Sequence, residues 1–171
     1  MLETLIPSKT RLRLLIKFFV NEANRAHMRG LAGEFNESTN AIRKELNHLS
    51  DAGYLERQSL GNRIDYRANI QHPLFGSLQQ IVHKYLGLAE IVEKVLARMG
   101  DVHQIWIIGD YAKGVDSGTI KVVVLGNNLE SDYGKQLADK LELLIGRKVE
   151  LHFWLPDEII KEPRLLMFGT S

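Results

Sequence analysis

The chain of 171 residues contains no cysteine, only four prolines and only two tryptophans. Without cysteine, disulfides and thiolate metal sites are excluded. The apolar runs are far too short to cross a bilayer, so no membrane partner is expected. The N-terminal stretch lacks the basic and apolar segments of a signal peptide, which predicts a cytoplasmic protein.

The chain also has almost no excess of one sign of charge over the other, because its net charge is only +1. The two halves nevertheless differ. Residues 1–86 hold 12 Lys and Arg against 8 Asp and Glu, whereas residues 87–171 hold 10 against 13. A basic first half is consistent with a polyanionic partner such as nucleic acid, although the excess alone is small.

Short helices and a hairpin are predicted in the first half of the chain. Apolar residues recur at helical spacing over three stretches, 12–19, 28–35 and 42–49. Ser8 and Ser38 are suited to cap the first and third helices, and Gly53 is suited to end the third. Alternation over 54–67 about Gly61-Asn62 predicts a β-hairpin.

Residues 74–99 have two helical patterns separated by Gly87, and the predicted boundary between domains 1–86 and 87–171 lies there. The segments predicted beyond it are a strand at 103–109, a strand at 119–125, a helix at 131–145, a strand at 148–154, and in the tail a short helix and the strand Leu165–Phe168. Ser131 is expected to cap the helix, with Tyr133, Leu137, Leu141 and Leu144 facing inward. The final strand is expected to pair within its own sheet or with a partner chain.

The predicted third helix has a polar face opposite its apolar stripe. If Ile42, Leu46 and Leu49 are buried, the polar residues at the same spacing share the other face. This face comprises Thr39, Asn40, Arg43, Lys44 and Asn47, and the hairpin adds Arg57, Asn62 and Arg63. Arg and Asn can bond base edges, while Lys and Thr can hold phosphates. Such a face is also compatible with a merely solvated helix.

Residues 8–75 resemble winged helix-turn-helix regulators of the broad arsenic-repressor-like class. The stretch "STNAIRKELNHLSDAGYLERQSLGNRIDYRAN" contains a capped recognition helix, Leu-x-x-Leu, Gly-Tyr-Leu and a wing. The resemblance implies double-stranded DNA as a partner. Metal-sensing members of that class use cysteine-rich sites, and here there is no cysteine and the six histidines form no ligand cluster. We therefore expect no metal site.

Residues 88–154 resemble the minimal nucleotidyltransferase domain of the DNA polymerase β superfamily. In "IIGDYAKGVDSGTIKVVVLG" the glycines and the alanine of the family turn are present. The two carboxylates that the family places at i, i+2 on the next strand to hold metal ions are replaced by Thr119 and Lys121. Glu150, the position of a third carboxylate, would stand alone. The resemblance thus implies a domain without enzymatic activity or cofactor.

A basic replacement in such a pocket suggests a different ligand. Lys113 and Lys121 could bind a small anion, such as a nucleotide, without metal. The candidate pocket comprises Gly109, Asp110, Lys113, Thr119, Lys121 and Glu150.

The two resemblances together indicate an α+β chain of two domains, a winged helix followed by a small nucleotidyltransferase-like α/β domain with a mixed sheet. This combination is similar to a family of small prokaryotic transcriptional regulators, joined through "HPLFGSLQQIVHKYLGLAEIVEKVL". It implies a DNA-binding regulator, homodimeric through the helices at 74–99, whose second domain serves ligand sensing or oligomerisation. The alternatives are an active nucleotidyltransferase of a toxin–antitoxin pair and a protein-interaction module.

Overall fold

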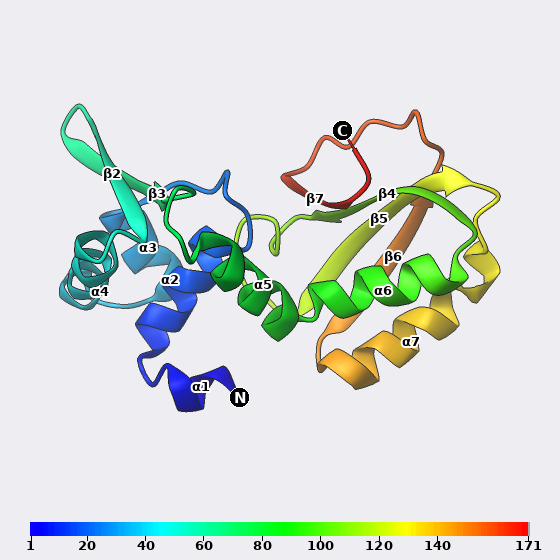
Figure 1. Ribbon diagram of the computed structural model, residues 1–171, viewed down its shortest axis with the longest axis horizontal. Helices are drawn as coiled ribbons and strands as arrows, with labels where there is room; N and C mark the ends of the chain where they lie inside the picture. The colour runs from blue at the N-terminus through cyan, green and yellow to red at the C-terminus, as the bar shows by residue number, and fades with distance from the viewer. Residues whose placement is uncertain (171) are drawn as a thin grey trace. The chain divides into compact units, whose positions relative to one another are not determined.

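The computed structural model describes residues 1–170 and shows two compact units (Figure 1). The division falls between Val82 and His83, inside the helix α5 (Phe75–Leu86), and Gly87 separates α5 from α6 (Leu88–Arg98). In the first unit the elements before α5 are α1 (Leu2–Leu5), α2 (Lys9–Phe19), β1 (Ala26–His27), α3 (Met28–Phe35), α4 (Thr39–Asp51), β2 (Leu55–Leu60) and β3 (Arg63–Ala68). The strands form a small antiparallel sheet in the order β1-β3-β2.

Local signals set the bounds of these elements as the sequence predicts. Ser8 and Ser38 cap α2 and α4, since their hydroxyls accept hydrogen bonds from the backbone N–H groups of Arg11 and Ala41. The strands β2 and β3 pair from Leu55↔Ala68 to Leu60↔Arg63, so the turn has two residues. Gly61 takes the positive φ of 62° that the first position of a tight hairpin turn requires.

The core of the first unit packs α2, α3 and α4 together. Phe18, Leu31, Ile42 and Leu46 are at most 1% exposed. Phe75 of α5 joins this core, with its ring 5.7 Å from that of Phe19. The apolar stripe of α4 is thus turned inward, and the opposite face of this helix remains at the surface.

The second unit is a four-stranded mixed sheet with helices on one face (Figure 1). Its remaining elements are β4 (Asp101–Ile108), β5 (Thr119–Asn127), a 3₁₀ turn η1 (Ser131–Tyr133), α7 (Gly134–Ile145), β6 (Lys148–Trp154) and β7 (Arg164–Phe168). The strand order is β6-β5-β4-β7, with only β5 and β6 parallel. A parallel pair needs a crossover, which α7 supplies, and α6 packs beside it.

Three details of the second unit differ from the sequence prediction. Ser131 does not cap α7, because it opens the 3₁₀ turn and the helix begins only at Gly134. Leu144 is 61% exposed, since Ile145 rather than Leu144 faces Gly87 of the neighbouring segment. Residues 157–163 form no helix, and Ile160 from this segment packs against the sheet face opposite α6 and α7.

The strand β7 pairs antiparallel with β4, so the final strand belongs to the sheet of its own chain. Among residues 1–170, none of the helices combines the length and the apolar character needed to cross a membrane.

Candidate nucleic-acid interface

The exposed side of α4 carries all five polar residues that the sequence analysis selected on this helix. Ile42 and Leu46 are fully buried and Leu49 is 6% exposed. The side chains on the opposite face, all exposed, are Thr39, Asn40, Arg43, Lys44 and Asn47. The face extends over three turns of a capped helix, which fixes its side chains at regular spacing.

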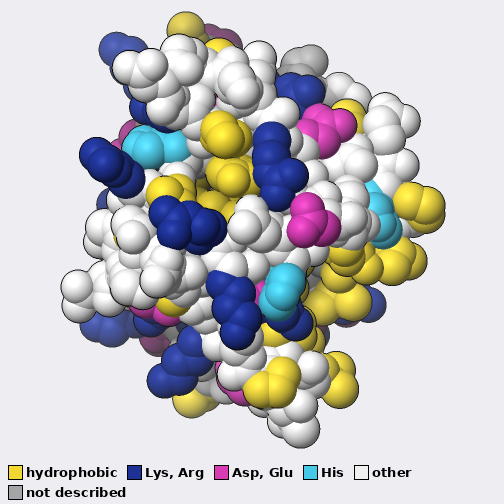
Figure 2. Space-filling view, turned by 90° about the vertical axis from the view of Figure 1, so that its left-hand side faces the viewer, with side chains coloured by type: hydrophobic (Ala, Val, Ile, Leu, Met, Phe, Trp, Pro, Cys, Tyr) yellow, Lys and Arg dark blue, Asp and Glu magenta, His cyan; other side chains and the backbone are white. Residues whose placement is uncertain are grey.

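The β2–β3 hairpin stands beside this helix and encloses a cavity with it. The cavity measures about 740 Å³ and is lined by His27, Met28, Arg29, Arg43, Asn47, Arg57, Asn62, Arg63, Ile64 and Tyr66. Figure 2 views the molecule from the side where α4 and the hairpin lie in Figure 1, and there Lys and Arg side chains surround a group of hydrophobic ones. Five of the eight predicted contact residues therefore line one hollow, while Thr39, Asn40 and Lys44 lie outside it on α4.

Arginines in this region are held by short-range contacts. Arg43 donates to Asn40 Oδ1 at 2.8 Å, within α4. Arg57, on β2, donates to Asn47 Oδ1 at 3.1 Å and lies 3.4 Å from Asp51 Oδ1, so the hairpin is tied to α4. The side chains of Arg57 and Asp51 are exposed, and exposed ion pairs contribute little to stability. The contacts instead orient the polar groups of Asn40, Arg43, Asn47 and Arg57.

Arg29 and His27, at the start of α3, extend the basic lining beyond the residues that the sequence predicted. Sequence periodicity could not have selected them, because they come from a different element. They join the site because β1 pairs with β3 in the register Ala26↔Tyr66 and His27↔Asp65 and because α3 packs on α4.

The helix α2 holds α4 in place through ion pairs. Arg11 Nε donates to Glu45 Oε2 at 2.8 Å, and the Glu45 side chain is only 10% exposed. Lys17 Nζ, also nearly buried, lies 2.7 Å from Glu34 Oε1 of α3. Charged groups removed from water in this way require their partners, so the Arg11–Glu45 pair holds α4 against α2 and the Lys17–Glu34 pair holds α3 against α2.

The residues of the predicted anion pocket are brought together only in part. Residues 109–114 form a turn closed by Lys113 N–H to Gly109 O at 3.2 Å, and no helix follows to direct backbone N–H groups at an anion. Lys113 lies 3.5 Å from Asp110 Oδ1 instead of facing Lys121. The sequence signal here was a turn motif, which specifies a backbone path and no side-chain direction.

Lys121 and Glu150 do meet, since β5 and β6 pair in the register Lys121↔Glu150. They line a cavity of about 410 Å³ with Ile108, His152, Trp154, Ile159, Ile160, Lys161 and Glu162. His152 Nε2 lies 3.7 Å from Glu150 Oε2. Thr119 pairs with Lys148 at the beginning of the strand and lies outside this lining. The cavity thus has both signs of charge.

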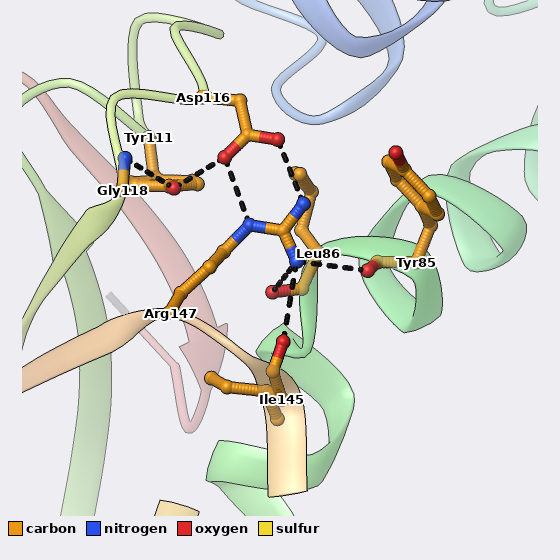
Figure 3. Close-up of polar contacts among 7 residues, drawn as sticks. All are labelled: Tyr85, Leu86, Tyr111, Asp116, Gly118, Ile145 and Arg147. Carbon is orange, nitrogen blue, oxygen red and sulfur yellow. Dashed lines mark hydrogen bonds and ion pairs between the residues drawn. The ribbon is translucent and has the colours of Figure 1, made fainter. Parts of the chain in front are cut away.

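A partly buried cluster in the second unit was missed by the sequence analysis (Figure 3). Arg147 donates to Asp116 with Nε at 2.8 Å and a terminal nitrogen at 2.7 Å. Its other terminal nitrogen reaches the carbonyls of Tyr85, Leu86 and Ile145 at 3.3–3.5 Å. The Tyr111 hydroxyl donates to Asp116 and accepts from Gly118 N–H at 2.9 Å. This cluster fixes the β4–β5 connection against the ends of α5 and α7.

The electrostatics of this cluster follow from burial and pairing. Burial and the hydrogen bond to Asp116 raise the pKa of Tyr111 well above its ordinary value. Burial acts to raise the pKa of Asp116 too, but hydrogen bonds from Arg147 and Tyr111 outweigh it and hold the pKa below its ordinary value. The hydrogen bonds to Asp116 raise the pKa of Arg147 despite its burial. All three groups therefore keep their ordinary charge states at neutral pH.

Comparison with protein-family models, with curated proteins and with solved structures finds no match for this chain. The chemical groups of the site must therefore carry the functional argument. Within residues 1–170, no three His, Asp or Glu side chains are grouped so that they could hold a metal ion.

Proposed function

We propose that this chain is a sequence-specific regulator that binds double-stranded DNA as a homodimer, with α4 as the recognition helix and the β2–β3 hairpin as the wing. The observation that carries the proposal is the basic hollow between α4 and the hairpin, with Arg43, Arg57 and Arg63 in its lining. An α-helix with an exposed polar face fits the major groove, and a basic hairpin beside it can reach the backbone or the minor groove.

The chemistry of the side chains divides the work between them. Arg43 lies in the middle of the α4 face and Asn47 at its C-terminal end, and both side chains can bond base edges. Lys44 and Thr39 suit phosphate contacts, as do Asn62 and Arg63 at the hairpin tip. Arg29 at the start of α3 adds a further basic group for the backbone. The proposal also accords with the resemblance of residues 8–75 to winged-helix regulators.

We propose no catalytic role for the second unit and assign it to ligand sensing or oligomerisation. The strand positions of the family's acid pair are Thr119 and Lys121, and the mixed-charge cavity at Lys121 has room for a small anionic ligand. Two exposed apolar residues, Leu74 directly before α5 and Ile81 on it, support a dimer contact through this helix. No specific feature favours the nucleotidyltransferase or the interaction-module alternative.

The test is selection of DNA sites from a random pool with the full chain at about 0.15 M salt, since affinities depend steeply on ionic strength. The expected product is a palindromic motif with half-site centres about 34 Å apart. Recovery of a non-palindromic motif would contradict the dimer, and absence of any motif would contradict sequence-specific binding.

Arg43→Ala is expected to weaken binding to the selected site by about 1–3 kcal/mol if Arg43 reads a base edge. Arg98→Ala is the matched control, because Arg98 is an exposed arginine on α6 whose guanidinium lies over the Tyr133 ring of its own unit. It removes the same charge and should leave affinity unchanged. Equal losses for the two variants would show that Arg43 contributes only general charge.

A further inference from the structure

We infer that the reading face of α4 presents hydrogen-bond donors almost alone and therefore recognises guanine in the half-site. This inference rests on the proposed DNA-binding function and specifies the base chemistry that the site reads. It follows from how the amides and arginines of the face are paired with one another, a feature that the sequence pattern does not contain.

Asn40 is the first amide of the face. Arg43 donates to its Oδ1 at 2.8 Å. A guanidinium can only donate, so the amide must turn its oxygen toward Arg43, and its outward group is the NH₂ donor. The same contact limits the conformational freedom of the Arg43 side chain. It uses one N–H group of the guanidinium, and the others do not bond Asn40. Asn40 is thus a positioning residue for Arg43.

Asn47 lies two helical turns further along α4. A residue of a different element orients its amide in the same way. Arg57 of β2 donates to Asn47 Oδ1 at 3.1 Å, and Asp51 Oδ1 lies 3.4 Å from the same guanidinium nitrogen. The amide oxygen of Asn47 therefore faces the Arg57 guanidinium. Because this oxygen is already occupied, the amino group of a base placed next to Asn47 would meet N–H donors. The group left to the groove is again an NH₂ donor.

The carboxylates near this face are already engaged. Glu45 is on the buried side of α4 and pairs with Arg11 at 2.8 Å. Asp51 pairs with Arg57, and Asp65 Oδ1 lies 3.0 Å from Arg63 Nε without a hydrogen bond, but it is buried and so turned away from the groove. Of the selected residues, as the structure describes them, the Thr39 hydroxyl on α4 and the Asn62 amide at the hairpin tip keep an acceptor that is paired with no arginine.

Donors alone select among the four bases in the major groove. Guanine presents two acceptors, N7 and O6, whereas adenine presents N7 beside the N6 amino donor, cytosine presents an amino donor, and thymine presents the single acceptor O4 beside its methyl group. The amino groups of adenine and cytosine would face further donors on this surface. Arg43 in a held orientation suits the two acceptors of guanine, and the NH₂ groups of Asn40 and Asn47 suit neighbouring N7 or O6 atoms.

The test uses base analogues in the duplex recovered by selection. Each guanine of a half-site is replaced singly by 7-deazaguanine, which lacks the N7 acceptor, and each adenine by purine, which lacks the N6 amino group. We expect at least one guanine replacement to weaken binding by about 5- to 150-fold, and each purine replacement to change it by less than about two-fold. A half-site without guanine, or losses at purine comparable to those at 7-deazaguanine, would overturn the inference while leaving the proposed function intact. Failure to recover any motif would instead overturn the proposed function and this inference with it.

Asn40→Ala tests the positioning step separately. It should reduce the discrimination between guanine and 7-deazaguanine at one position of the half-site, with affinity for random DNA unchanged. Asn127→Ala is the control, because it removes an exposed amide from the second unit. Unaltered discrimination in Asn40→Ala would show that Arg43 needs no support from Asn40 and would contradict the paired-donor geometry.

Discussion

Replacement of Asp116 by Asn is expected to destabilise the second unit by about 2 kcal/mol, because it breaks a two-bond contact with Arg147. Asp116 accepts hydrogen bonds from Arg147 at 2.8 and 2.7 Å, and another from Tyr111. In the variant one carboxylate oxygen becomes an NH₂ group that faces a donor. A hydrogen bond to a charged group contributes about 1.5–3 kcal/mol, and the lower part of that range applies since the Asp116 side chain is 30% exposed and partly hydrated.

The effect has a defined pH dependence. The pKa of Asp116 lies below its ordinary value in the folded protein, because the hydrogen bonds from Arg147 and Tyr111 outweigh the opposing effect of burial. The carboxylate therefore contributes its full stabilisation above the unfolded pKa of about 3.9, and this contribution is lost as the pH falls through the folded pKa. The difference in the free energy of unfolding between the wild type and Asp116→Asn should be constant near neutral pH and should become smaller below about pH 4.

The assay is urea unfolding followed by tryptophan fluorescence. Both tryptophans of the chain, Trp106 and Trp154, lie in the second unit, so the signal reports this unit alone. Glu90→Gln is the control, because it breaks the exposed Glu90–Lys94 pair at 3.8 Å and should change stability by less than about 0.5 kcal/mol. An Asp116→Asn variant as stable as this control at neutral pH, or a difference that persists undiminished at low pH, would refute the reasoning.

Two further predictions concern the second unit. Gly126→Ala should destabilise the second unit by about 1–3 kcal/mol in the same unfolding assay, because a Cβ would lie 2.1 Å from the Asp101 carbonyl oxygen of β4. The control is Gly33→Ala, at an open helical position, which should leave stability unchanged or raise it when unfolding is followed by circular dichroism. Equal effects of the two substitutions would contradict the packing of β4 on β5. In alkaline titration followed by phenolate absorbance, Tyr133→Phe should remove an early-ionising group, because the hydrogen bond from Lys140 lowers the pKa of Tyr133. Tyr111→Phe should leave the early part of the curve of the folded protein unchanged, because burial and the hydrogen bond to Asp116 raise the pKa of Tyr111. A Tyr111→Phe protein that loses an early-ionising group would show that the cluster is open to solvent.

Elements fixed by local chemistry were predictable from the sequence. Ser38 caps α4, Gly61 turns the hairpin and Gly87 separates α5 from α6, each by a rule that acts within a few residues. The inward stripe of α7 was predictable only as far as Leu141. Leu144 and Ile145 are apolar at i+3 and i+4 from it, so periodicity alone could not decide which one packs, and the contact of Ile145 with Gly87 decides it.

Contacts between distant segments were not predictable. Arg147 and Asp116 are 31 positions apart and come together because the parallel β5–β6 pair brings the start of β6 to the β4–β5 connection. In the same way, the turn motif at Gly109 gave no direction for Lys113, which pairs with Asp110. In the first unit the members of the α4 face were predictable from helical spacing, but the link from Arg57 to Asn47 depends on how the hairpin packs against the helix.

The degree to which each arginine is engaged separates the structural role of Arg147 from the recognition role proposed for Arg43. Arg147 uses Nε and both terminal nitrogens on Asp116 and three backbone carbonyls, and its side chain is 15% exposed, so at most one of its donors is left for a ligand. Arg43 is exposed and makes one hydrogen bond, to Asn40, among the contacts that residues 1–170 show. A guanidinium has five donors, so the four that remain are held in a definite direction at the surface. Orientation by one amide lowers the entropy that binding must remove, which is the advantage of a pre-organised reading group over a free side chain.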